Sequence, residues 1–210
     1  MIEYLDIKNI AFQILGYPIS YVELIATLFG LISVYFATKE NILTWGTGII
    51  NEIFLYILFF QVQLYADMFL QIYFFLVTLY GWYNWKSNST NNKIEKISFR
   101  NRILLALIIL LSTFVLGFIF SNIHLYLKSY FKIQATYPFT DSFIMASSIV
   151  ATILLAKKKI ENWYMWIVND MTCVLLYFKK GIYFLSIEYL IFLGIVFYGL
   201  YQWEKQIKND

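Results

Sequence analysis

The chain has 210 residues, of which 60% are hydrophobic, 21% are aromatic and only 14% are charged. Soluble domains have about 45–50% apolar and about 25% charged residues, so this composition excludes an ordinary water-exposed domain. The net charge of +3 gives no indication of a nucleic-acid partner, and a single cysteine and a single histidine exclude an intrachain disulfide and a His/Cys zinc site. No cofactor or metal is expected.

Residues 1–20 have acidic residues early and lack the basic stretch followed by an apolar run that marks a signal peptide. Apolar residues are interspersed there with Lys8, Asn9 and Gln13. We expect an amphipathic segment lying at the membrane surface. A short extra membrane-embedded helix is the alternative.

Seven later segments approach the roughly 20 apolar residues that a helix needs to cross a bilayer. They are residues 21–38, 45–60, 66–85, 101–122, 141–156, 163–178 and 182–203. The polar run 87–92 predicts a linker after the third segment, and Pro138 precedes the fifth.

Residues 23–86 align without a gap with residues 141–204, at an offset of 118. Trp45 then matches Trp163, and Asn51-Glu52 matches Asn169-Asp170. A duplicated unit in so apolar a chain indicates a transporter. The fourth segment returns the chain to its starting side, which makes the two repeats parallel, as in SWEET transporters.

The predicted fold class is therefore an all-α integral membrane protein with a three-one-three helix arrangement. The predicted divisions are an N-terminal segment, a first repeat, a linker containing the fourth helix, a second repeat and a cytoplasmic tail: residues 1–20, 21–86, 87–140, 141–205 and 206–210. Eleven basic residues fall on one side of the membrane and five on the other. The positive-inside rule predicts a cytoplasmic C-terminus and an external N-terminus.

Glu52 and Asp170 occupy one repeat position, seven residues after Trp45 and Trp163, which is about 10 Å along a helix. A carboxylate at that depth costs about 2.5–3.5 kcal/mol on insertion scales, so it should face a cavity or a partner. Every Lys and Arg lies in a predicted loop or at a helix end. A cationic substrate would supply the missing partner.

Helical spacing places these acids on one face with indole and amide side chains, which suit an aromatic cation with a hydroxylated tail. The predicted substrate-binding residues are Trp45, Asn51, Glu52, Trp163, Trp166, Asn169 and Asp170. Gly48 stands where the second repeat has Trp166. Further lining or gating residues are expected to be Gln71, Tyr80, Trp82, Trp85, Tyr177 and Glu188.

Each of these residues also has a structural alternative. Trp45 and Trp163 could belong to the interfacial aromatic belt, as could the tryptophans and Tyr80 at the end of the third segment. Asn51 and Asn169 could bridge helices by hydrogen bonds, and the two acids could be protonated structural residues.

Three stretches are similar to the PnuC family of bacterial vitamin transporters. One runs from Gln61 to Trp85 and ends in YGWYNW, another runs from Lys159 to Asp170 and contains ENWYMW, and the third is residues 177–183. The resemblance extends over about residues 20–205. The chain departs from it at Trp45-Gly46-Thr47-Gly48, where many members have proline after the tryptophan.

The resemblance implies a SWEET-like fold, often trimeric, in the bacterial inner membrane. It implies uptake of nicotinamide riboside, an NAD precursor, by facilitated diffusion, with trapping by a cytoplasmic kinase. Thiamine, also an aromatic cation, is the alternative substrate. A membrane enzyme or a scaffold fits less well, because no catalytic set is present and buried paired acids indicate function. Proton coupling stays open.

Overall fold

The computed structural model describes residues 5–14, 16–62, 65–87, 93–126 and 134–209. Residues 1–4 of the predicted N-terminal segment, most of the predicted linker at 88–92, part of the break before the second repeat at 127–133, and Asp210 lie outside them. Within the described residues the elements are β1 (Ile10–Ile14), β2 (Tyr17–Ser20), α1 (Tyr21–Thr38), α2 (Leu43–Gln61), α3 (Tyr65–Ser87), α4 (Phe99–Tyr126), α5 (Pro138–Ala156), α6 (Glu161–Lys179) and α7 (Tyr183–Asn209).

All seven predicted helices are confirmed, and five of them are long and apolar enough to cross a membrane. These are α1, α2, α4, α5 and α7. Polar side chains lower the hydropathy of α6, and four of them, Glu161, Asn162, Asn169 and Asp170, are buried against other helices. α7 continues beyond the predicted end at Trp203, so residues 206–209 are helical.

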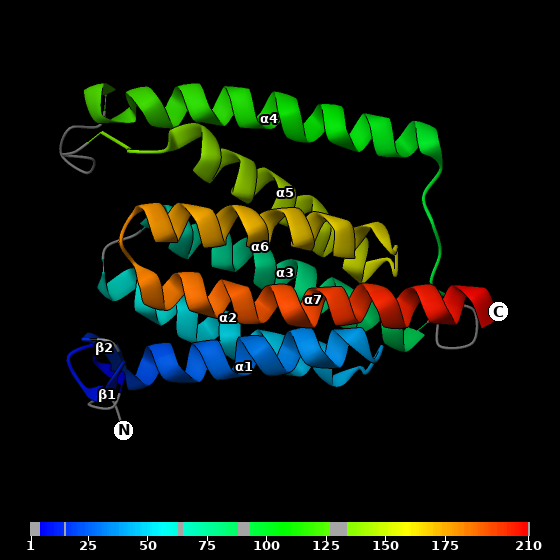
Figure 1. Ribbon diagram of the computed structural model, residues 1–210, viewed down its shortest axis with the longest axis horizontal. Helices are drawn as coiled ribbons and strands as arrows, with labels where there is room; N and C mark the ends of the chain where they lie inside the picture. Colours follow the sequence, from blue (N-terminus) through cyan, green and yellow to red (C-terminus); the bar gives the residue numbers. More distant parts are fainter. Residues whose placement is uncertain (1–4, 15, 63–64, 88–92, 127–133, 210) are drawn as a thin grey trace.

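Six helices pack in a closed ring in the order α1, α2, α3, α5, α6, α7, with α7 returning to α1. α4 packs against α5 and lies outside this ring, as Figure 1 shows along its upper edge. α1 and α7 both start at the end of the molecule that carries β1 and β2, and the C-terminus lies at the opposite end (Figure 1).

The repeat seen in the sequence is reproduced in the helix bounds. α2 and α6 begin and end 118 positions apart, and α3 and α7 begin 118 positions apart. α1 and α5 end on Thr38 and Ala156, which are also 118 positions apart. Equivalent side chains can therefore be compared directly between the two halves.

The N-terminal segment is a β-hairpin, in which β1 and β2 pair antiparallel with Gly16 at φ 81° in the turn region. The alternative of a short extra helix is wrong for residues 5–14 and 16–20. The alternation of Ile10, Phe12 and Ile14 is a two-residue period that suits a strand, and all three side chains are exposed. The placement of this apolar edge at a membrane surface stays a prediction.

The hairpin is fastened to one end of the helix ring. The Gln61 side chain accepts a hydrogen bond from Ile7 N at 3.0 Å and donates to Leu5 O at 2.6 Å. The Tyr17 ring stacks on Phe184 at 5.3 Å, and its hydroxyl donates to Glu23 at 2.9 Å. Burial, together with this bond to Glu23, raises the pKa of Tyr17 to about 12.

At the opposite end, α1 and α5 stop in the same way. The residues after their C-caps, Glu40 and Lys158, both have φ of 50°, a left-handed conformation that is uncommon outside glycine. Their side chains form an ion pair at 2.8 Å, and each is 13% exposed. Lys158 Nζ also lies 4.8 Å from the centre of the Trp85 ring. Equivalent residues of the two halves thus pair with one another.

Reversing the charge of Lys158 should destabilise the contact between the halves. Exposed ion pairs contribute under about 1 kcal/mol, whereas breaking a buried pair costs about 3–5 kcal/mol. For this partly buried pair we expect Lys158→Glu to lower the free energy of unfolding by about 1–2 kcal/mol. The double variant Glu40→Lys/Lys158→Glu should recover most of the loss in thermal unfolding in detergent. If the double variant lost as much free energy of unfolding as the two single variants together, the two residues would not be coupled.

The stretch before α4 crosses the same end of the ring. Glu95 pairs with the backbone of the turn between α5 and α6, donating N–H to Lys158 O and accepting from Ile160 N. The Lys159 ammonium donates to Glu95 and lowers the pKa of that carboxyl. Arg102 Nη2 lies 2.8 Å from Glu161 Oε1, which ties α4 to the start of α6. This end is therefore closed by ion pairs drawn from both halves.

Candidate functional site

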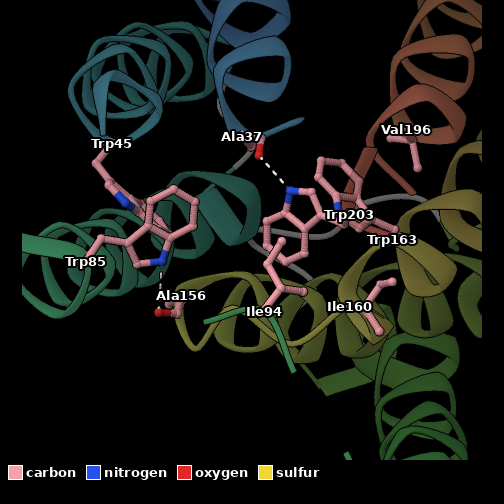
Figure 2. Close-up of a cluster of buried hydrophobic side chains, with 9 residues drawn as sticks. All are labelled: Ala37, Trp45, Trp85, Ile94, Ala156, Ile160, Trp163, Val196 and Trp203. Atoms are coloured by element: carbon pink, nitrogen blue, oxygen red, sulfur yellow. Dashed lines mark hydrogen bonds between the residues drawn. The ribbon is translucent and has the colours of Figure 1, made fainter. Parts of the chain in front are cut away.

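Four buried tryptophans form a continuous row across the molecule, which we call the tryptophan row: Trp45, Trp85, Trp203 and Trp163. Trp45 and Trp85 meet edge to face at 5.1 Å, and their counterparts Trp163 and Trp203 meet at 5.4 Å. Trp85 and Trp203 join the halves at 6.5 Å. Figure 2 shows the Trp85 indole donating to Ala156 O and the Trp203 indole to Ala37 O, each at 3.2 Å.

Two equivalent glycines make room for this row. A Cβ atom at Gly81 would lie 2.3 Å from Trp45 Cη2, and one at Gly199 would lie 2.6 Å from Trp163 Cη2. These distances are far below van der Waals contact, so only glycine fits at either place. The glycine of the YGW motif therefore has a packing role, which Gly199 repeats in the second half.

The predicted substrate residues Trp45 and Trp163 thus lie in the core in this conformation, at 3% and 1% exposure. Their indole Nε1 atoms are buried and have no hydrogen-bond partner among the described residues. Trp166 is partly buried and packs against the same cluster. Trp45 and Trp163 each contact the tryptophan of their own half, Trp85 and Trp203. Their role in binding substrate stays a prediction.

Glu52 and Asp170 lie about two helical turns farther along α2 and α6, at 8% and 4% exposure. Glu52 Oε1 accepts a hydrogen bond from Thr78 Oγ1 of α3 at 2.5 Å. Glu52 Oε2 and Asp170 Oδ2 are buried and have no partner among the described residues. No salt bridge to either acid is found in the part of the chain that the structure describes. Within the described residues, each half therefore holds one buried carboxylate oxygen that has no donor.

Asn51 and Asn169 point to neighbouring helices. The Asn51 amide donates to Ala26 O of α1 at 2.8 Å. The Asn169 amide donates to Ser148 Oγ of α5 at 3.0 Å and accepts from Ser147 Oγ. Both asparagines thus bridge the first two helices of their repeat in this conformation. A role in binding substrate stays a prediction.

A pocket of about 310 Å³ lies between α2 and α3. Its lining is mostly apolar with two polar side chains, and it consists of Glu52, Ile53, Tyr56, Gln71, Ile72 and Phe75. This volume is at the lower end of the range for small-molecule sites, which are typically apolar with a few placed polar groups. Glu52 and Gln71 therefore provide the polar groups of this pocket, which is open to the surface because Ile53, Tyr56 and Ile72 are 44%, 38% and 41% exposed.

The other predicted lining residues are dispersed. Tyr80 and Trp82 are 44% and 38% exposed on the outer face of α3, as the interfacial-belt alternative requires. Tyr177 stacks on Tyr189 at 5.4 Å. Glu188 lies at the hairpin end, beside Thr27 of α1 and near Glu23. Trp85 belongs to the tryptophan row.

Thr78, Ser147 and Ser148 were not predicted as site residues, although each bonds a predicted site residue. Small hydroxyl residues are common in membrane helices, so their presence alone carries little signal. The repeat offered a stronger signal, because Thr78 aligns with Val196 and the two halves differ at this position.

The sequence matches the nicotinamide mononucleotide transporter family over residues 20–205. The nicotinamide riboside transporter PnuC of Escherichia coli is 31% identical over 207 residues, covering 90% of this chain and 87% of that protein. The riboflavin/roseoflavin transporter RibM of Streptomyces davaonensis is 24% identical over 200 residues, covering 95% of this chain and 92% of that protein. The crystal structure of the vitamin B3 transporter PnuC has the same fold, with a TM-score of 0.68 at 22% identity, covering 90% of this chain and 83% of that one.

Proposed function

Since the chain belongs to the nicotinamide mononucleotide transporter family, it is a multi-pass membrane transporter of vitamins and not an enzyme, and we propose that its substrate is nicotinamide riboside. This compound combines a positively charged pyridinium ring with a ribose. The proposal rests on the relative from Escherichia coli and on the chemistry of the buried acids.

One observation carries the choice of a cationic substrate. Glu52 contributes a carboxylate to the pocket between α2 and α3, and one of its oxygens has no partner among the described residues. An unpaired buried carboxylate is costly, and a bound cation would offset that cost. The pyridinium supplies such a cation, and Gln71 supplies donors and acceptors for its polar substituents.

We propose uptake by facilitated diffusion, with phosphorylation by a cytoplasmic kinase retaining the substrate. Buried carboxylates also carry protons in some transporters. Uptake into vesicles driven by a pH gradient alone, and abolished by Asp170→Asn, would establish proton coupling and replace this part of the proposal.

The proposed architecture is two parallel three-helix repeats, α1–α3 and α5–α7, joined by α4. The 118-residue offset of the helix bounds and the position of α4 outside the ring support it. The excess of basic residues favours a cytoplasmic location for the end that carries the tryptophan row, with the hairpin outside, in a bacterial inner membrane. A homotrimer is proposed from the family resemblance, and light scattering of the detergent-solubilised protein measures it.

Calorimetry on the purified protein tests the substrate. We expect nicotinamide riboside to bind with a dissociation constant in the micromolar range or below. Thiamine is the second candidate because its thiazolium ring is also an aromatic cation, and riboflavin serves as a neutral comparison. Binding of thiamine without binding of the riboside would overturn the proposed substrate and leave the transporter function in place.

A further inference from the structure

The two buried acids occupy equivalent positions but have different surroundings. Thr78 donates to Glu52 Oε1 at 2.5 Å, and Thr78 is itself only 4% exposed. Its counterpart in α7 is Val196, which is 2% exposed and has no donor to offer Asp170. The counterpart of Gln71 is Tyr189, whose ring stacks on Tyr177. The first half therefore has a hydroxyl donor and an amide where the second half has a valine and a tyrosine.

The Thr78 hydroxyl has two effects on Glu52. A hydrogen bond to a charged acceptor is about twice as strong as one to a neutral acceptor, so the bond favours the ionised carboxylate. It also occupies Oε1 and so restricts the side-chain rotamer, while Oε2 is buried and has no partner among the described residues. Glu52 also lines the pocket between α2 and α3, so a ligand in that pocket contacts this side chain.

We infer that Thr78 is a positioning residue that holds Glu52 ionised and oriented, so that the cationic ring of the substrate binds in the first repeat. This inference rests on the transport function proposed above. Asp170 lacks the equivalent hydroxyl, so its ionised form is less stabilised and it favours a cation less than Glu52 does. The two halves of the site therefore differ in their preference for positive charge, and the substrate binds in one orientation.

The test compares nicotinamide riboside with its neutral dihydro form, which has nearly the same shape without the ring charge. Affinities for both are measured by calorimetry on the purified full-length protein. Losing a hydrogen bond to a charged group costs about a factor of ten or more. Thr78→Val should therefore weaken binding of the cation about tenfold and change binding of the neutral form less than about threefold.

Thr78→Ser keeps the hydroxyl and should bind the cation within about threefold of the wild type. Thr172→Val is the matched control, because the Thr172 hydroxyl donates to Val168 O of its own helix and not to a site residue among those described. It should leave both affinities unchanged. Equal weakening of both ligands by Thr78→Val would mean that Thr78 only supports packing, and would overturn the inference.

A second measurement needs no substrate. A hydrophobic carbodiimide reacts with protonated buried carboxyl groups, and mass spectrometry locates the adduct. Thr78→Val should increase labelling of Glu52 and leave labelling of Asp170 unchanged. If the wild type binds no riboside, the proposed substrate fails and this labelling still decides the role of Thr78. Unchanged labelling of Glu52 would reject that role.

Discussion

Replacing Trp163 with alanine is expected to lower the free energy of unfolding by about 3–5 kcal/mol, because the substitution empties a closely packed site. The Trp163 ring is 1% exposed, meets Trp203 edge to face and fills the space above Gly199. For a chain of this length the loss corresponds to a decrease in Tm on the order of 10 °C, measured by thermal unfolding in detergent.

Trp82→Ala is the matched control. This tryptophan is 38% exposed on the outer face of α3, so we expect a loss of about 1 kcal/mol or less. Equal losses for the two variants would show that the tryptophan row does not stabilise the fold. Trp163→Phe separates packing from binding, since it keeps most of the ring volume. A Trp163→Phe variant that is stable and fails to bind substrate would support the predicted binding role of this residue.

Removing the charge of Glu52 should have the largest effect on transport. Two unit charges about 4 Å apart attract by about 4 kcal/mol at an effective dielectric constant of 20, and desolvation offsets part of this. We expect Glu52→Gln to reduce the rate of uptake of the riboside into proteoliposomes by about ten- to a hundredfold. The amide is nearly isosteric and needs no counter-charge, so thermal stability should be unchanged or higher.

Glu204→Gln provides the control for uptake. Glu204 lies near the end of α7, where it accepts a hydrogen bond from Tyr164 at an exposed site. It is distant in sequence from Glu52 and Asp170. The Glu204→Gln variant should take up the riboside at the same rate as the wild type, at equal protein content. Wild-type uptake by a stably folded Glu52→Gln variant would remove Glu52 from the substrate site.

Apolar runs, together with the polar breaks between them, predicted all seven helices, although only five pass on length and hydropathy. The ungapped repeat added the equivalence of α2 and α6, which the structure reproduces at both ends. The hairpin was missed, because its alternating apolar residues cover only five positions. The two-residue alternation of Ile10, Phe12 and Ile14, followed by Gly16, was the available signal.

The candidate site was harder to predict than the fold. In a membrane helix, a face that packs on other helices and a face that lines a cavity are both turned away from lipid, so both attract polar and aromatic residues. The pattern from Trp163 to Asp170 therefore predicted a face turned away from lipid. It did not show which residues of that face pack on other helices and which line a cavity. In the structure, Asn51 and Asn169 form hydrogen bonds to neighbouring helices, and Trp163 packs in the hydrophobic core. Glu52 lines a pocket.

The ion pair between Glu40 and Lys158 has a consequence for how the halves recognise each other. These residues are repeat equivalents, so a pair of identical halves would bring glutamate against glutamate or lysine against lysine. Like charges at that separation would disfavour self-association of either half. Expressed as two separate polypeptides, the halves should therefore prefer each other over copies of themselves, because divergence at this position favours pairing of unlike halves.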